Sequence, residues 1–133
     1  MSDKKELEEI KLNLTKQLNS INGKLSKIFI TENKPLYEKM YNDTYWTYSN
    51  SYGGNTKKWT VYIHAKKVDS IWDCGNNGIN AYIICDTFQL TSDNQIIIHF
   101  NERNYPHGFE NKITKKAFTN AVSKMLKKAK DAI

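Results

Sequence analysis

Residues 84–100 read ICDTFQLTSDNQIIIHF, which is two strand patterns separated by a turn. The apolar stretches on both sides of the turn, such as Ile96-Ile97-Ile98, have the length of strands. A three-residue loop with Asn94 in the left-handed conformation pairs Leu90 with Ile96 and gathers the large apolar side chains on one face. A two-residue loop scrambles the faces, because a shift of one residue reverses every side chain. The predicted strands are residues 79–90 and 95–103.

The flanking segments supply further elements. Trp59–Ala65 alternates cleanly and predicts another strand, while Asn77-Gly78 favours a tight turn before the hairpin. Residues 114–130 carry a broad apolar stripe and predict a helix capped by Thr114. The segment Tyr45–Asn55 holds four aromatic residues among small polar ones, and we expect its Tyr48–Tyr52 part to be a loop or hairpin end.

Residues 3–29 predict one long helix with a narrow apolar stripe of near-heptad spacing. Such a helix either lies on its own sheet or pairs with the helix of a second subunit as a coiled coil, which would make a homodimer. Pro35 is expected to end it, with residues 36–42 as a short helical turn. The stripe, and so the candidate dimerisation surface, is Leu7, Ile10, Leu14, Leu18, Ile21, Leu25 and Ile28.

The order of elements predicts an α+β fold. We expect a small antiparallel sheet of about three to four strands, with a long N-terminal helix and a C-terminal amphipathic helix packed on one face. The 133 residues fit a single domain, made of a helical arm (3–29) and an α+β body (36–133). No apolar run has the roughly 20 residues of a membrane span, and the charged N-terminus is unlike a signal peptide. These features indicate a cytoplasmic protein without a membrane partner.

The charge balance favours a polyanionic partner. The net charge is +6, and Arg103 is the only arginine among 20 basic residues. Such a chain attracts nucleic acid or an acidic protein surface. The excess of lysine favours loose electrostatic attraction over the reading of bases, for which the arginine fork is better suited.

Aromatic and basic residues combine in the middle of the chain. Aromatic rings can stack on bases while lysines neutralise phosphates, but the same rings can close the edge of a small core and the same lysines can guard strand edges. The six lysines of the C-terminal helix can likewise follow a phosphate backbone or form its solvated side. The candidate partner-binding residues here are Tyr45, Trp46, Tyr48, Tyr52, Lys57, Lys58, Lys66 and Lys67.

A polar sheet face is the third candidate surface. The predicted register brings His99, Asn101 and Arg103 together, with His64 on the corresponding face of the neighbouring strand. Arg103 is a reasonable anchor for a phosphate or carboxylate. Two histidines near a cation can also perform phosphodiester chemistry, although the paired His-x-Ser/Thr pattern of such enzymes is lacking.

The sequence names no catalytic residue, metal ligand or cofactor. Two cysteines and three histidines do not have the spacing of a zinc finger, and the familiar catalytic signatures are lacking. The leading hypothesis is a small, basic, non-catalytic protein that binds nucleic acid or a nucleic-acid-handling protein. One alternative is a phage or mobile-element inhibitor or accessory protein that binds a host defence protein, as anti-CRISPR proteins do. The other is a small histidine-dependent nuclease or phosphodiesterase.

Overall fold

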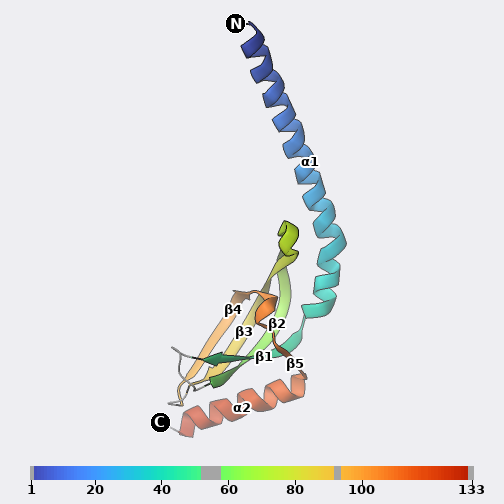
Figure 1. Cartoon of the computed structure of the whole chain (residues 1–133). Helices are drawn as coiled ribbons and strands as arrows, with labels where there is room; N and C mark the ends of the chain where they lie inside the picture. Colours follow the sequence, from blue (N-terminus) through green and yellow to red (C-terminus); the bar gives the residue numbers. More distant parts are fainter. Residues whose placement is uncertain (1, 52–57, 92–93, 132–133) are drawn as a thin grey trace.

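The computed structural model describes residues 2–51, 58–91 and 94–131. Across these residues two helices flank one antiparallel sheet of five strands in the order β4-β3-β2-β1-β5 (Figure 1). The elements are α1 (Ser2–Tyr41), β1 (Thr44–Ser51), β2 (Lys58–Asp73), β3 (Ile79–Leu90), β4 (Ile96–Asn104), β5 (Asn111–Ile113) and α2 (Lys115–Asp131), with short 3-10 helices at Gly75–Asn77 and Pro106–Gly108. The predicted α+β class is confirmed, with one or two more strands than expected.

The β3–β4 hairpin has the predicted register at its loop. Leu90 pairs with Ile96 and Phe88 with Ile98. Asn94 has a φ of 64°, and the Thr91 amide donates to the Gln95 carbonyl over 2.8 Å. Ser92 and Asp93 lie outside the described residues. The three-residue loop deduced from the apolar pattern is therefore consistent with the pairing around it.

The aromatic segment is a strand as far as Ser51, so residues 48–51 continue a strand where a loop or hairpin end was expected. Thr44–Ser51 is β1, and it pairs along its whole length with the first half of β2. The expectation was wrong because β1 carries aromatic rings on both faces, so it lacks the polar–apolar alternation of a half-buried strand. The three-residue strand β5, also not predicted, extends the sheet beside β1. Tyr52 and Lys57 lie outside the described residues.

Strand β2 runs eight residues beyond its predicted end at Ala65. The sequence pattern does not reveal this continuation because two β-bulges interrupt the alternation. Register shifts fall between Ala65 and Lys67 and between Val68 and Ser70. Each bulge inserts one residue, so the buried positions continue at Val68 and Ile71 rather than at every second residue.

The two faces of the sheet are covered by different helices. One face carries the main core, in which Phe29, Tyr37 and Tyr41 of α1 pack on residues such as Ile63 and Ile83. On the other face, Phe118 of α2 contacts Tyr45 and Phe88. Helix α2 thus covers one face, as expected, whereas the end of α1 lies on the opposite face rather than beside it.

Helix α1 continues through Pro35, contrary to the expected end before this residue. Pro35 has no amide hydrogen to donate to the Thr31 carbonyl, and a proline inside a helix usually bends it. Figure 1 shows α1 bending where it runs along the sheet. The packing of Phe29 and Tyr37 on the core holds both sides of the bend against β2, which explains why the helix continues despite the proline.

The first two-thirds of α1 project away from the sheet (Figure 1). The seven stripe residues from Leu7 to Ile28 are each 53–65% exposed. The alternative in which this stripe lies on the chain's own sheet is therefore wrong for residues 7–28. We call this projecting segment the arm.

Candidate nucleic-acid interface

Helix α2 begins where the sequence predicts. The Thr114 hydroxyl accepts a hydrogen bond from the Ala117 amide at 3.1 Å, which caps the first turn. Phe118 and Met125 are buried against the sheet, and Ala121 and Val122 are half-buried between them. The apolar stripe thereby fixes which side of the helix faces the sheet and turns the lysines toward solvent.

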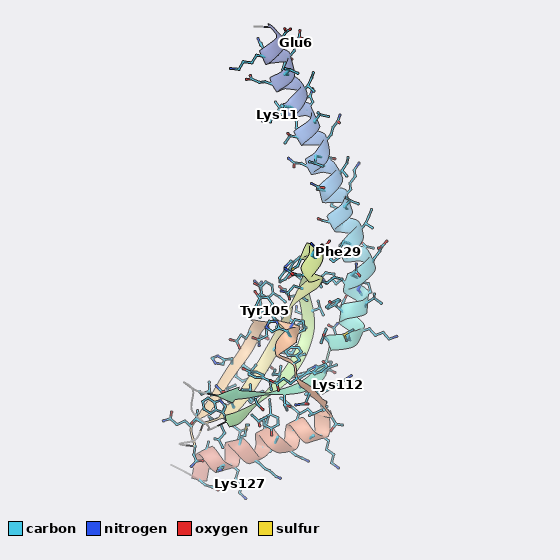
Figure 2. All side chains as sticks on the ribbon, in the orientation of Figure 1. Glu6, Lys11, Phe29, Tyr105, Lys112 and Lys127 are labelled. Carbon is cyan, nitrogen blue, oxygen red and sulfur yellow. The ribbon has the colours of Figure 1, made fainter. Side chains whose placement is uncertain are left out.

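Most of the net charge of the chain belongs to this one helix. Its six lysines and single aspartate leave a net charge of +5, against +6 for the whole protein. All six lysines are exposed, and Figure 2 shows Lys127 pointing away from the sheet. Since the lysines lie within five turns of helix, their potentials add over one surface. They are Lys115, Lys116, Lys124, Lys127, Lys128 and Lys130.

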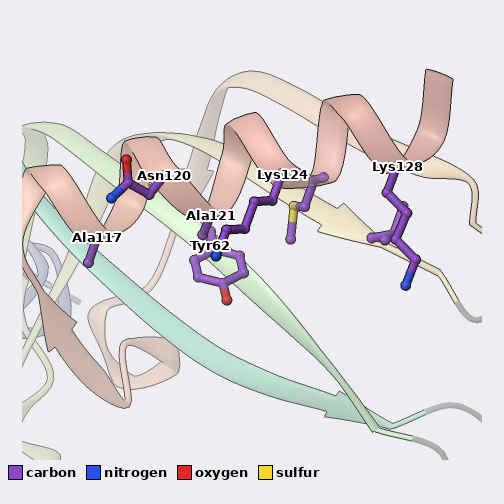
Figure 3. Close-up of a pocket in the computed structure, with 8 residues that line it drawn as sticks. Tyr62, Ala117, Asn120, Ala121, Lys124 and Lys128 are labelled. Atoms are coloured by element: carbon purple, nitrogen blue, oxygen red, sulfur yellow. The ribbon is translucent and has the colours of Figure 1, made fainter. Parts of the chain in front are cut away.

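A groove of about 360 Å³ runs between α2 and the sheet. Lys124 and Lys128, four residues apart, border it on the helix side, and the ring of Tyr62 lies on the β2 side (Figure 3). Met125 and Leu90 add apolar lining, and Asn120 adds an amide. The groove therefore combines two cations with an aromatic ring, which suits a ligand that carries both negative charge and a planar or apolar group. We call α2 and this groove the basic surface.

The aromatic residues of β1 mainly fill the core. Tyr45 is 8% exposed and stacks on His64, with ring centroids 4.5 Å apart and an angle of 9° between the rings. Trp46 and Tyr48 lie on the other face of β1, where they pack on the main core. Burial raises the pKa of both the Tyr45 and Tyr48 hydroxyls. These rings close the edge of the core, so a base-stacking role is not open to Tyr45.

The lysines at the end of the first predicted strand differ in their surroundings. Lys66 Nζ lies 3.3 Å from Asp86 Oδ2 and donates to Asn101 Oδ1 over 2.8 Å. Lys67 is exposed. The Lys58 side chain, like the whole of Lys57, is outside the described residues. Lys66 is thus engaged within the sheet, and Lys67 remains available to a partner.

The predicted polar face does not form, because β4 contains a bulge opposite Asp86. His99 lies opposite Thr87, but the register then shifts and Arg103 lies opposite Ile84. His99 consequently shares the face covered by α1, whereas Asn101 and Arg103 belong to the face covered by α2. Arg103 Nε is 3.2 Å from Asp69 Oδ2, so the arginine is already paired within the chain.

The bulge also separates the two histidines proposed for phosphodiester chemistry. His64 stacks on Tyr45 beneath α2, whereas His99 projects from the other face. His64 Nε2 donates to Asp43 Oδ1 at 2.8 Å. Because the two imidazoles lie on opposite sides of the sheet, they cannot act on one phosphodiester. The expected catalytic pair is therefore not assembled.

Cysteine and metal chemistry find little support in the described part of the chain. Burial raises the pKa of the Cys85 thiol to about 12, which keeps it protonated and unreactive at neutral pH. Neither Cys85 nor Cys74 is in a disulfide. Among the described residues, no three His, Cys, Asp or Glu side chains are grouped to hold a metal ion.

Sequence reasoning missed the groove but not the helix that borders it. The sequence pattern indicates the lysines of α2 as a possible binding surface. It does not indicate Tyr62 as part of that surface, because the ring lies on the more polar side of the predicted strand. The spacing of Lys124 and Lys128 was the available signal, since residues four apart share one side of a helix.

No protein-family model, curated protein or solved structure matches this chain. None of the helices in the described ranges has the length and apolar character needed to cross a membrane.

Proposed function

We propose that this protein is a non-catalytic binding protein that holds the phosphate backbone of nucleic acid on the basic surface. The observation that carries the proposal is the concentration of charge, since α2 supplies +5 of the net +6. The remainder of the chain is close to neutral, so a polyanion is attracted to one side of the body.

The chemistry of the surface favours binding without base-specific reading. Lysine ammonium groups act as point charges toward phosphate and lack the planar fork that recognises guanine. Binding of this type releases counterions and weakens steeply as salt rises. Tyr62 and Met125 in the groove provide an apolar contact for a sugar or an unstacked base beside the phosphates.

An acidic protein, such as one that itself handles nucleic acid, would use the same lysines and is the second candidate partner. The two partners differ in a simple measurement. A nucleic-acid binder retains a mixed-sequence oligonucleotide at low salt, whereas a protein with an acidic protein partner ignores free oligonucleotides. Lys124 and Lys128 contribute to either complex.

The test is fluorescence anisotropy with a mixed-sequence 20-mer, single-stranded and duplex, over a salt series. We expect affinity to fall as salt rises, with a log–log slope that drops by about 2.7 for duplex when Lys124, Lys127 and Lys128 are changed to Gln, roughly 0.9 for each lost phosphate contact.

The matched control changes Lys4, Lys5 and Lys11 of the arm to Gln, which removes the same charge far from α2. This variant should keep most of the wild-type slope. Failure of the wild type to bind either oligonucleotide at 50 mM salt would reject the proposal, as would equal losses in the two triple variants.

A further inference from the structure

The arm carries an apolar stripe whose spacing is regular over about six turns of helix. From Leu7 the steps to Ile10, Leu14, Leu18, Ile21 and Leu25 are 3, 4, 4, 3 and 4 residues, and Phe29 follows after 4 more. This is an 11-residue repeat, which averages 3.67 residues per turn and stays on one side of an almost straight helix. A stripe of this kind suits pairing with another long helix.

The stripe is exposed along the arm, where each of its residues from Leu7 to Ile28 is more than half exposed. The repeat ends at Phe29, which packs on the core together with Tyr37 and Tyr41 further along α1. A second helix can therefore lie along the stripe on the arm without displacing these core contacts.

Charge along the arm is divided between its two ends. Residues 3–9 hold four carboxylates and two lysines, whereas residues 10–31 hold four lysines and no carboxylate. In a parallel pair, the acidic ends would lie together and the basic segments would lie together. In an antiparallel pair the two acidic ends are separated, which is the more favourable arrangement.

We propose that the arm pairs with the arm of a second copy of this chain in antiparallel orientation. The register that overlaps the stripes places Leu7 level with Ile28 and Leu14 level with Ile21. In this register residues 3–9 are level with residues 26–32 of the partner helix, whose only charged residues are Lys27 and Glu32. The overlap of the apolar stripes thus sets the register, and the separation of the two acidic ends favours the antiparallel orientation.

The body adds a second feature at the end of the stripe. A groove of about 420 Å³ lies where α1 leaves the sheet, lined by Leu25, Phe29 and Ile30 of the helix and by Ile71 and Trp72 of β2. Leu25 belongs to both the stripe and the groove. In the proposed register residues 5–10 of the partner helix lie level with this groove, so the apolar surface available to them extends onto β2.

The antiparallel dimer has a defined consequence for the basic surface. The two bodies lie at opposite ends of the paired arms. The two copies of Ile28, at which the arms end, are about 30 Å apart along the helix axis. Each dimer therefore presents two copies of α2 that can engage one extended polyanion together, which raises avidity without any new contact.

Sedimentation of the full chain at micromolar concentrations, without nucleic acid, tests the pairing. We expect the wild type to be a dimer and the variant Leu14→Lys with Ile21→Lys to be a monomer. The control, Leu12→Lys with Asn19→Lys, adds the same charge at the same spacing on another side of the helix and should remain dimeric. A wild-type monomer at every concentration, or a stripe variant that still associates, overturns the proposal.

Disulfide trapping tests the orientation. Leu7→Cys and Ile28→Cys chains, each also carrying Cys74→Ser, are mixed after one of them has been lengthened by a tag, and then oxidised. Antiparallel pairing gives a cross-link between unlike chains and none when Leu7→Cys is oxidised alone. Cross-linking of Leu7→Cys to itself overturns the antiparallel orientation. Because no nucleic acid is present, either result leaves the role of the basic surface to its own test.

Discussion

The imidazole of His64 donates through Nε2 to Asp43 Oδ1 at 2.8 Å, which joins β2 to the turn between α1 and β1. Asp43 has a φ of 53°, a conformation that aspartate and asparagine tolerate better than most residues. The hydrogen bond from His64 lowers the pKa of the Asp43 carboxyl, and the charge of Lys115 lowers it further. The contact therefore depends on an ionised aspartate.

We predict that Asp43→Asn reduces stability near neutral pH and loses this effect in acid. A carboxyl with a lowered pKa in the folded state contributes stability above its ordinary pKa of about 4, and this contribution is lost as pH falls through the folded pKa. Asparagine keeps the left-handed turn but not the charge. Denaturant unfolding of both proteins between pH 3 and 7 should show their difference shrinking below pH 4; a constant difference contradicts the prediction.

The ring of Tyr45 is predicted to matter for stability rather than for binding. Tyr45 is buried against His64 and Phe118, so Tyr45→Ala should lower the free energy of unfolding by about 3 kcal/mol, as expected for a large aromatic residue in a core. Tyr45→Phe keeps the ring and should cost less than about 1 kcal/mol. Urea unfolding measures both. If Tyr45→Ala were as stable as the wild type, the ring would not be a core residue and could contact a partner.

Replacing Arg103 is predicted to have little effect on stability or on binding. Its side chain is 64% exposed and its partner Asp69 is 31% exposed, so the pair is largely solvated. Exposed ion pairs contribute about 0–1 kcal/mol, and lysine keeps the charge. Arg103→Lys should therefore change neither the unfolding free energy nor the oligonucleotide affinity by more than about 1 kcal/mol. A larger loss of affinity would show that the guanidinium leaves Asp69 to hold a partner.

The sequence predicts those elements whose pattern is local. Leu90 and Ile96 could be paired because a single loop length keeps the apolar side chains on one face. The β1 strand escaped prediction because Trp46 and Tyr45 face different apolar layers, and the helix was cut at Pro35 because local propensity does not include the packing of Tyr37 on the core. Tertiary contacts overrode the local signals in both cases.

The candidate site was less predictable for a related reason. The lysines of α2 follow from its amphipathic pattern, but Tyr62 joins them only because α2 packs across β2. The polar face failed because one bulge reverses every residue beyond it, which separates Arg103 from His99. Asn101, where the chain adopts the left-handed conformation, gave a weak signal, since asparagine is uncommon in strands and tolerant of positive φ.

The bulge at Asn101 provides the last prediction. Asn101 has a φ of 55°. Its backbone amide donates to Asp86 Oδ1 at 3.0 Å, and its side-chain Oδ1 accepts from Lys66 Nζ at 2.8 Å. Asn101→Ala and Asn101→Gly both remove the side-chain contact with Lys66. Only alanine carries the steric penalty of the left-handed conformation, which is about 1–2 kcal/mol.

The Asn101→Gly variant avoids this penalty, but the greater freedom of glycine in the unfolded chain lowers its stability by roughly 0.4–1 kcal/mol. We therefore expect Asn101→Gly to be more stable than Asn101→Ala by about 1 kcal/mol, with both below the wild type. Denaturant unfolding at equal m-values measures the difference. If Asn101→Ala were the more stable variant, residue 101 would not need the left-handed conformation, and the bulge that turns Arg103 away from His99 would not depend on it.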